Sequence, residues 1–404
     1  MTQRITYDGK LYVLMVSPEY PPMAGGVGRY TANLTRALRQ SGIKVDVVCN
    51  EAGKGDFNGI SPSNRYNSDV LLDIVNETKP DLVHVQYEQG LYGLCLDPVY
   101  PMKSSTNIDR FYDKCDVPIV TTFHSGYTYK QWMSLVAPLN KTGFDSKFQI
   151  YSRMLSQYWK HLLNYWSFHL LNTRKIGPTR YGLVFSKYLS ERIPGTRIIY
   201  HGSESVVPNF VSKVQARREF SIPEDCKIAL ALGFATKTKG WNLLSKMKVP
   251  EGWKIVINSS KNHYNTETTR FQFENHNILD LKKGYLSDIE LSYLLHSADI
   301  LLLPYTVSSG SGVMFDGLGH GLPFISSDIP FFREFSQMGL GITVSRNAEE
   351  FSRAFTKMDH QYGEYKLNVD RFKRNIAWTK ISEMHEALYK TMMEEKLARF
   401  TVGC

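Results

Sequence analysis

Short apolar runs alternate with amphipathic stretches along the chain. In the first half, six runs rich in Val, Ile and Tyr predict short buried strands, at 11–16, 44–49, 82–86, 119–122, 182–185 and 197–200. After the first run, apolar residues recur every three or four positions across 27–41, as in an amphipathic helix. Strands that alternate with helices predict parallel βαβ units and a doubly wound sheet.

The pattern restarts after a polar segment at 204–225. Five further apolar runs, at 228–232, 253–257, 300–303, 323–326 and 341–343, predict a second parallel sheet. Helices are predicted at 239–247, 287–296, 312–319, 348–358 and 378–397. The chain is therefore expected to be an α/β protein with two Rossmann-like, doubly wound domains that face a central cleft. Ligands of such sheets bind beyond the carboxyl ends of the strands, so the loops that follow strands are where chemistry is expected.

Length and composition support this interpretation. The chain has 404 residues, of which 42% are hydrophobic and 22% charged, and these values suit two globular domains rather than a disordered chain or a coiled coil. No run of about 18 apolar residues predicts a membrane-spanning helix, and the run at 11–16 is too short for a signal peptide. The five cysteines are scattered without a Cys-x-x-Cys pair, so neither a zinc site nor a disulfide framework is indicated. A cytoplasmic location is expected.

Two loops in the first half carry residues suited to binding. Gly25, Gly26 and Gly28 let backbone N–H groups approach a ligand at the start of a helix, although the Gly-x-Gly-x-x-Gly dinucleotide pattern is absent. The alternative is a tight turn that binds nothing. His124 follows a predicted strand, where an imidazole can donate to a ligand or act as an acid or base; alternatively, it bonds to backbone within its loop.

Two loops in the second half complete the candidate site. Lys237 and Lys239 lie in a strand-to-helix turn, where they are either point charges for a phosphate or part of a solvated surface. A Ser/Gly loop that opens the helix at 312–319 predicts an anion-binding nest of backbone N–H groups and hydroxyls. The residues of this nest are Ser309, Gly310, Ser311 and Gly312. Asp316 follows one turn later and is suited to accept hydrogen bonds from a sugar or ribose.

Eight segments carry a family resemblance. They are PEYPPMAGGVGRYTANLTRAL (18–38), PDLVHVQYEQGLYG (80–93), PIVTTFHS (118–125), YGLVFSKYLSERI (181–193), IIYHGSE (198–204), GFATKTKGWNLL (233–244), LSDIELSYLLHSADILLLPY (286–305) and SSGSGVMFDGLGHGLPFISSDIPFFREF (308–335). In this order and spacing they resemble the retaining GT-B glycosyltransferases of the "glycosyl transferases group 1" family, which includes glycogen synthase-like and mannosyltransferase-like enzymes. Together the segments cover most of the chain.

The resemblance implies both a fold and a reaction. It implies an acceptor domain at 1–205, a donor domain at 206–377, and a C-terminal helix at 378–404 that crosses back onto the first domain. It also implies transfer of a sugar from an NDP-sugar, as substrate, to a glycan, lipid-linked or small-molecule acceptor, with retention at the anomeric carbon and with no metal or other cofactor.

The resemblance also assigns roles to individual residues. It places Gly25 and Gly26 beside the donor phosphates and the acceptor, and His124 near the reacting carbon of the sugar. It places Lys239 and the loop 310–312 at the phosphates. With Asp316 expected at the ribose or sugar, His124 and Asp316 are the candidate catalytic residues.

This sequence departs from the family pattern at two places. The family's arginine after the first glycine of the second domain is Phe234, and Thr236 stands where a related subgroup has arginine, so Lys237 is expected to substitute. The family's two glutamates eight residues apart are Ser308 and Asp316, of which only Asp316 keeps a carboxylate. A GT-B phosphorylase, a sugar-nucleotide epimerase and a non-catalytic nucleotide-binding relative therefore stay open as alternatives.

A basic, aromatic stretch lies at 129–180. It contains eight Lys or Arg residues against one Asp, and a helix is predicted at 148–171. One interpretation is a helix face that packs on the first domain while its lysines are solvated. The other is a surface that meets an anionic membrane, at the inner face, or a lipid-phosphate-linked acceptor. No motif supports binding to nucleic acid.

Overall fold

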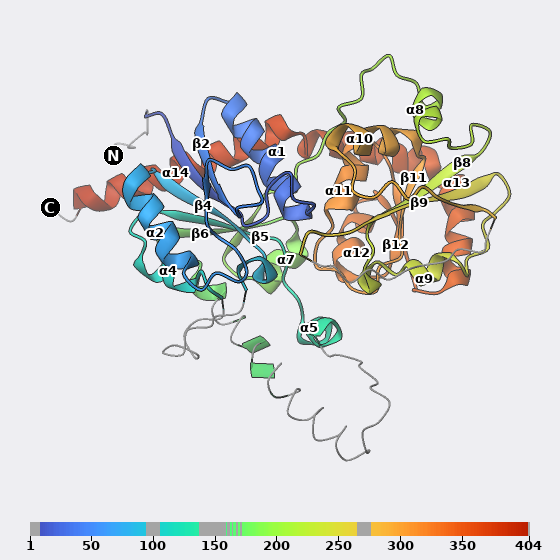
Figure 1. Cartoon of the computed structure of the whole chain (residues 1–404). Coiled ribbons are helices and arrows are strands. Elements are labelled where there is room, and N and C mark those ends of the chain that lie inside the picture. The colour runs from blue at the N-terminus through green and yellow to red at the C-terminus, as the bar shows by residue number, and fades with distance from the viewer. Residues whose placement is uncertain are drawn as a thin grey trace.

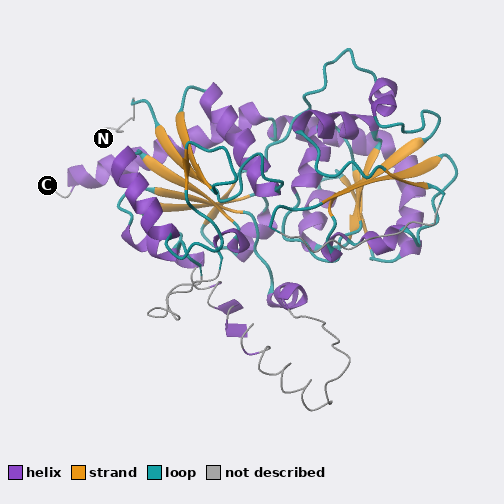
Figure 2. Ribbon diagram, viewed as in Figure 1, coloured by secondary structure: helices purple, strands orange, loops and turns teal. Residues whose placement is uncertain are grey.

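The computed structural model describes residues 9–93, 106–136, 159, 162–163, 165–166, 169, 172–264 and 276–402. These residues form two α/β units that lie side by side, each with a parallel sheet between helices (Figures 1 and 2). The predicted α/β class with two Rossmann-like units is confirmed. Within the described ranges, no helix combines the length and apolar composition needed to cross a bilayer.

The N-terminal unit has a seven-stranded parallel sheet in the order β3-β2-β1-β4-β5-β6-β7. Its strands are β1 Tyr12–Val16, β2 Lys44–Cys49, β3 Phe57–Asn58, β4 Leu82–Tyr87, β5 Ile119–Phe123, β6 Arg180–Val184 and β7 Thr196–Ile198. Its helices are α1 Gly26–Gln40, α2 Asn67–Thr78, α3 Gln89–Tyr92, α4 Asp109–Lys114, α5 Tyr129–Val136 and α7 Lys187–Arg192. The strand order reverses between β1 and β4, which is where such sheets bind ligands.

The C-terminal unit repeats this plan with six parallel strands in the order β10-β9-β8-β11-β12-β13. They are β8 Lys227–Phe234, β9 Trp253–Ser260, β10 Ile278–Asp280, β11 Ile300–Leu303, β12 Phe324–Ser327 and β13 Gly341–Val344. The helical segments are α8 Lys213–Glu219, η1 Lys237–Lys239, α9 Trp241–Leu244, α10 Asp288–Ser297, α11 Gly312–Gly319, α12 Pro330–Gln337, α13 Ala348–Phe372 and η2 Lys373–Asn375. Here the strand order reverses between β8 and β11.

The final helix, α14 Trp378–Val402, runs back from the C-terminal unit and packs against α1 of the N-terminal unit (Figure 1). Its Tyr389 hydroxyl lies 2.6 Å from Nδ1 of the buried His84 in β4. Loops also join the units, because the His263 N–H donates to the Ala24 carbonyl at 2.9 Å. The loops at the carboxyl ends of the two sheets are therefore held face to face.

Several elements differ from the sequence expectation. The helix predicted at 239–247 is only a 3-10 turn followed by α9, because Gly240 adopts a left-handed conformation (φ 70°, ψ 25°). A Cβ at Gly240 would lie 1.8 Å from the Pro304 carbonyl oxygen, so the close approach also requires glycine. The helix predicted at 348–358 extends to Phe372, since Val369 and Phe372 are buried against the core. Most of the helix predicted at 148–171 lies outside the described residues.

Candidate functional site

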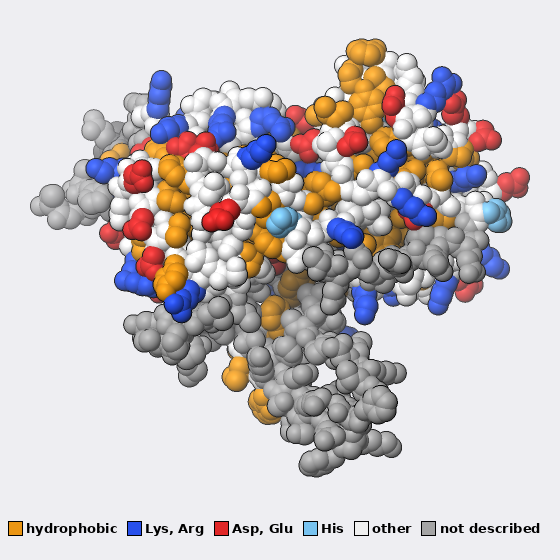
Figure 3. Space-filling view, in the orientation of Figure 1, with side chains coloured by type: hydrophobic (Ala, Val, Ile, Leu, Met, Phe, Trp, Pro, Cys, Tyr) orange, Lys and Arg blue, Asp and Glu red, His pale blue; other side chains and the backbone are white. Residues whose placement is uncertain are grey.

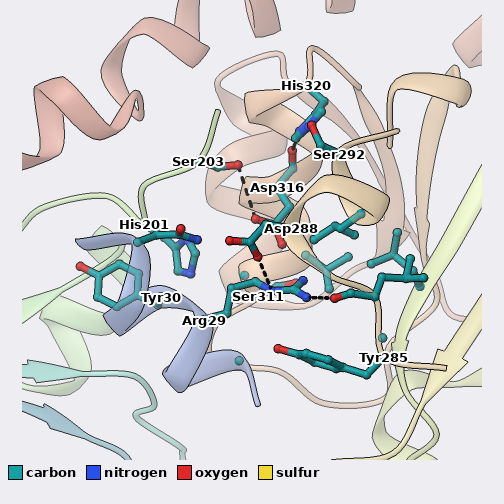
Figure 4. A pocket seen from close by; sticks show the side chains of 18 of the residues that line it. Arg29, Tyr30, His201, Ser203, Tyr285, Asp288, Ser292, Ser311, Asp316 and His320 are labelled. Atoms are coloured by element: carbon teal, nitrogen blue, oxygen red, sulfur yellow. Dashed lines mark hydrogen bonds and ion pairs between the residues drawn. The ribbon is translucent and has the colours of Figure 1, made fainter. Parts of the chain in front are cut away.

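Two neighbouring cavities lie where the carboxyl ends of the two sheets face each other. The first cavity, of about 290 Å³, is lined by Arg29, Lys239, Tyr285, Asp288 and Asp316 among others (Figure 4). The second cavity, of about 450 Å³, is lined by Glu19, Glu88, His124, Tyr127 and Tyr264 among others. Gly26, His201, Phe234 and residues 310–312 line both cavities and form the wall between them.

The loop before α11 lets a ligand come close to backbone N–H groups. Ser311 is the N-cap of α11, and its hydroxyl accepts from the Met314 N–H at 3.2 Å. The N–H groups of Gly312 and Val313 belong to the first helical turn, which has no intrahelical acceptors for them, and both residues line the first cavity. A Cβ at Gly310 would lie 3.1 Å from the His124 carbonyl oxygen. The predicted nest therefore sits at a helix N-terminus that opens into the cavity.

The structure separates the two lysines of the β8–α9 turn. Lys239 lines the first cavity, and its Nζ lies 3.9 Å from the ring centroid of Tyr305. Lys237 is exposed and lines neither of the two cavities. Of the two lysines expected at a phosphate, Lys239 therefore faces the first cavity, while Lys237 lies on the exposed side of the turn.

Gly25 leaves room for the buried carboxylate of Glu19. It is the N-cap of α1 in an extended conformation (φ −163°, ψ 152°) that any residue adopts. A Cβ there would lie 1.6 Å from the carboxyl carbon of Glu19. Glu19 is buried and accepts from the Gly28 N–H at 3.0 Å. A protein carboxylate thus occupies the start of α1, where the sequence suggested a bound anion.

His124 lies at the end of a buried hydrogen-bond chain. Its Nε2 is 2.9 Å from Oε1 of Gln86, while the Gln86 amide nitrogen is 3.2 Å from Nε2 of His84. The Thr122 hydroxyl, at 2.8 Å, shares that His84 nitrogen, and the Tyr389 hydroxyl meets His84 Nδ1 at 2.6 Å. Because the Gln86 amide donates to His84, His84 carries its proton on Nδ1, and the Gln86 oxygen can only accept from His124 Nε2–H.

Burial and these hydrogen bonds together fix the protonation state of His124. Burial, with a smaller contribution from His201, lowers the pKa of His124 to about 3, so the imidazole is neutral near pH 7. With its proton held on Nε2 by Gln86, the free ring atom is Nδ1, which can only accept a hydrogen bond. His124 is therefore suited to accept from a ligand hydroxyl rather than to donate a proton.

Asp316 lines the first cavity close to the residues that join the two units. Its Oδ1 accepts from the Ser203 hydroxyl at 3.4 Å (Figure 4). Burial raises the pKa of Asp316 to about 6, while the Arg29 guanidinium opposes this shift. His320 bonds to the Asp316 carbonyl oxygen at 2.7 Å and to the Ser292 hydroxyl at 2.6 Å, which fixes this part of the wall.

Sequence reasoning missed an ion pair between the units. Arg29 of α1 lies 3.2 Å from Asp288 at the start of α10, and its guanidinium stacks 4.7 Å from the centroid of Tyr285 (Figure 4). The Tyr285 hydroxyl donates to the Gly25 carbonyl at 3.1 Å. Arg29 directly follows Gly28 of the glycine loop, and that position was the available signal. The first cavity is therefore lined by three cations, Arg29, Arg36 and Lys239, and by the carboxylates of Glu204, Asp288 and Asp316.

Glu88 was also missed, although it directly follows β4. Burial raises the pKa of Glu88 to about 7, and a hydrogen bond from Ser125 opposes this shift. The nearby Glu19 carboxylate contributes to this rise in the Glu88 pKa. The place of Glu88 directly after a fully buried strand was the available signal.

Comparisons with known proteins agree with this geometry. Residues 24–176 match the model of Glycosyltransferase Family 4. The O-antigen biosynthesis glycosyltransferase WclY of Escherichia coli is 26% identical over 211 residues, which are 48% of this chain and 57% of WclY. The match thus spans little more than half of that relative's length.

Two solved structures share the fold over nearly the whole chain. Sucrose-phosphate synthase from Thermosynechococcus elongatus has a TM-score of 0.65 at 13% identity, covering 95% of this chain and 99% of that one. Alr3699/HepE from Anabaena, solved with UDP-glucose, has a TM-score of 0.58 at 11% identity, covering 98% of this chain and all of the other. At these identities the likeness shows the fold. Residues 24–176 form a domain of Glycosyltransferase Family 4, and the chain is a homologue of glycosyltransferases with the GT-B architecture.

Proposed function

We propose that the chain is a glycosyltransferase that moves a sugar from an NDP-sugar to an acceptor hydroxyl, with retention at the anomeric carbon and without a metal. The observation that carries this proposal is the first cavity, where the N-terminus of α11 opens toward a space that Lys239 and Arg29 also line. Helix N-terminal N–H groups and cations together suit a diphosphate. The UDP-glucose bound by Alr3699/HepE supports a nucleotide-sugar donor.

In this proposal the protein acts mainly by stabilising the leaving diphosphate. As the bond between the anomeric carbon and the phosphate oxygen breaks, negative charge grows on the phosphate, beside Lys239 and the 310–312 loop. The acceptor oxygen bonds to the anomeric carbon on the same face, and its proton passes to the leaving phosphate. Asp316 lines the donor cavity, where it accepts hydrogen bonds from ribose or sugar hydroxyls.

His124 fits this scheme as a group that binds the transferred sugar. It lines the second cavity next to the shared wall at 310–312, so it lies near the place where donor and acceptor meet. Because its Nδ1 can only accept, we expect it to hold a sugar hydroxyl. Its loss should therefore lower turnover more than nucleotide affinity.

The acceptor is proposed to be a glycan or a lipid-linked sugar, presented at the cytoplasmic face of a membrane. Trp159, Leu163 and Trp166 are each more than half exposed, and hydrophobic side chains project from this part of the molecule (Figure 3). They belong to the basic stretch 129–180, whose charge suits anionic lipid headgroups. Salt-sensitive sedimentation with anionic vesicles tests this part of the proposal.

A thermal-shift screen of UDP-, GDP- and ADP-sugars tests the donor. A ligand at about 100 times its Kd stabilises the protein by about 2.7 kcal/mol, so one nucleotide should raise the midpoint clearly. Gly312→Val, which fills the approach to the diphosphate, should abolish that shift. Phosphate-dependent release of a sugar phosphate would point to a phosphorylase instead. Epimerised NDP-sugar would point to an epimerase, and binding without turnover to a non-catalytic relative.

A further inference from the structure

We propose that the C-terminal helix serves the sugar site: Tyr389 of α14 and Met15 of β1 are positioning residues that hold the proton of His124 on Nε2; this inference rests on the proposed function. Helix α14 runs back from the C-terminal unit along the N-terminal unit (Figure 1), and its Tyr389 hydroxyl lies 2.6 Å from Nδ1 of His84. Gln86 then joins His84 to His124. The side chains of Tyr389, Met15, His84 and Gln86 are all buried.

Burial fixes the number of protons in this hydrogen-bond chain. Together with smaller contributions from His385 and His124, it holds the pKa of His84 well below its usual range, so His84 is neutral near pH 7. His124 is neutral as well. Burial also raises the pKa of Tyr389 well above its usual range, so the hydroxyl keeps its hydrogen. Each imidazole therefore carries one proton, and only the nitrogen that carries it can change.

Two orders of hydrogen bonds are compatible with these protons. In the first, His84 Nδ1–H donates to the Tyr389 oxygen, and the Gln86 amide donates to His84 Nε2. The Gln86 oxygen then accepts from His124 Nε2–H. In the second order the Gln86 amide is turned over and each of these bonds reverses, so His124 carries its proton on Nδ1. Both orders keep one proton on each ring, and the neighbouring groups decide between them.

Met15 selects the first order. Its Sδ accepts from the Gln86 amide at 3.2 Å, and a thioether sulfur can accept but never donate. In the second order the Gln86 oxygen would face this sulfur, so two acceptors would meet and one hydrogen bond would be lost. Met15 therefore keeps the amide nitrogen of Gln86 on its own side and the oxygen toward His124.

Tyr389 supports the first order at the other end of the hydrogen-bond chain. There His84 Nδ1–H is a buried donor, and the Tyr389 oxygen accepts its proton. Without that oxygen the donor would have lost its partner, which is costly in a buried place. The His84 proton is then better placed on Nε2, where the Thr122 oxygen lies 2.8 Å away and a turned Gln86 amide offers a second acceptor. Loss of the Tyr389 hydroxyl therefore favours the second order.

The order matters for the proposed reaction because His124 lines the second cavity beside the shared wall. Positive charge grows on the anomeric carbon as the diphosphate leaves. In the first order the free Nδ1 of His124 offers a lone pair, which stabilises such charge, whereas an N–H at the same place opposes it. Losing the first order should therefore slow sugar transfer without weakening nucleotide binding.

The test is 15N NMR of the histidine side chains in the whole protein without ligand, near pH 7. The signals of His124 are identified by their loss in His124→Gln. In the parent, His124 should carry its proton on Nε2. Tyr389→Phe should move part of the population to the Nδ1–H tautomer. Adding Met15→Leu, a volume-conserving change, should make that tautomer about tenfold more populated than the Nε2–H tautomer.

Tyr362→Phe is the matched control. The Tyr362 hydroxyl of α13 also donates one hydrogen bond, to the Asp299 carbonyl at 3.2 Å, but it lies in the other unit. Its loss should leave the His124 tautomer unchanged, however much it lowers Tm. An Nδ1–H tautomer in the parent would overturn the inference, as would an Nε2–H tautomer that persists in the double variant.

Kinetics separate this inference from the proposed function. In the double variant kcat should fall about tenfold, while the Kd of the nucleotide changes less than about twofold. An unchanged kcat despite a changed tautomer would overturn the role of Tyr389 and Met15 in sugar transfer. A parent protein that binds no nucleotide would instead refute the proposed function, and the NMR result would still decide which residues set the His124 tautomer.

Discussion

Replacing Gly25 by Ala should destabilise the N-terminal unit through one specific clash. The new methyl group would lie 1.6 Å from the Glu19 carboxyl carbon and 1.8 Å and 2.0 Å from its oxygens, so the buried carboxylate must move. It would lose its hydrogen bond from the Gly28 N–H, which is worth about 1.5–3 kcal/mol for a charged acceptor. The extended backbone at Gly25 adds no strain, so we expect a total cost of about 2–4 kcal/mol.

The assay is urea or thermal unfolding followed by tryptophan fluorescence. A loss of about 3 kcal/mol in a unit of this size lowers Tm by roughly 6–12 °C. The control is Glu19→Ala, which removes the carboxylate. In that background Gly25→Ala should cost less than about 1 kcal/mol, because the clash with the carboxylate is gone. A Gly25→Ala variant as stable as the parent, or the same cost with and without Glu19, would refute the reasoning.

Three further predictions concern single side chains. Lys239→Ala should weaken nucleotide binding about 10- to 100-fold by calorimetry, whereas Lys237→Ala should change it less than about twofold; equal effects would remove Lys239 from the phosphate site. Gln86→Leu should lower turnover at least about tenfold with nucleotide affinity nearly unchanged, and 15N NMR should show that the His124 proton no longer stays on Nε2; an unchanged tautomer would contradict this. Asp316→Asn should stabilise the fold by about 1–2 kcal/mol at pH 8, because the raised pKa makes ionised Asp316 costly in the fold, and this gain should vanish below about pH 4. A gain in stability that grows as the pH falls would contradict this prediction.

The sequence predicted most of the two sheets because their central strands are buried on both faces. Such strands appear as continuous apolar runs, as Ile300–Leu303 does, and their ends set the positions of the loops. The edge strands β3 and β10, of two and three residues, were not predicted, because neither stands in an apolar run that marks it. The helix predicted at 239–247 is not formed as expected, because Gly240 adopts a left-handed conformation that interrupts it. The spacing of apolar residues does not indicate such a change in backbone conformation.

The sequence predicted those parts of the candidate site that directly follow a predicted strand. Lys239 and the 310–312 loop were found because they follow strands that the apolar pattern located. Glu19 was not predicted, because nothing in the sequence around it indicates that a glutamate between Pro18 and Tyr20 is buried. The structure shows that it is buried because Gly25 leaves room for its carboxylate. The pair of Arg29 and Asp288 joins the two units, and no local pattern indicates a contact between residues so far apart in sequence.

The most direct test of the account is a crystal structure of the protein with an unreactive NDP-sugar analogue. The account predicts phosphate oxygens within about 3 Å of Lys239 Nζ and of the N–H groups at 310–312, with the sugar turned toward the wall that the two cavities share. A diphosphate bound instead at the start of α1, beside Gly25 and Gly26 and with Glu19 displaced, would contradict it.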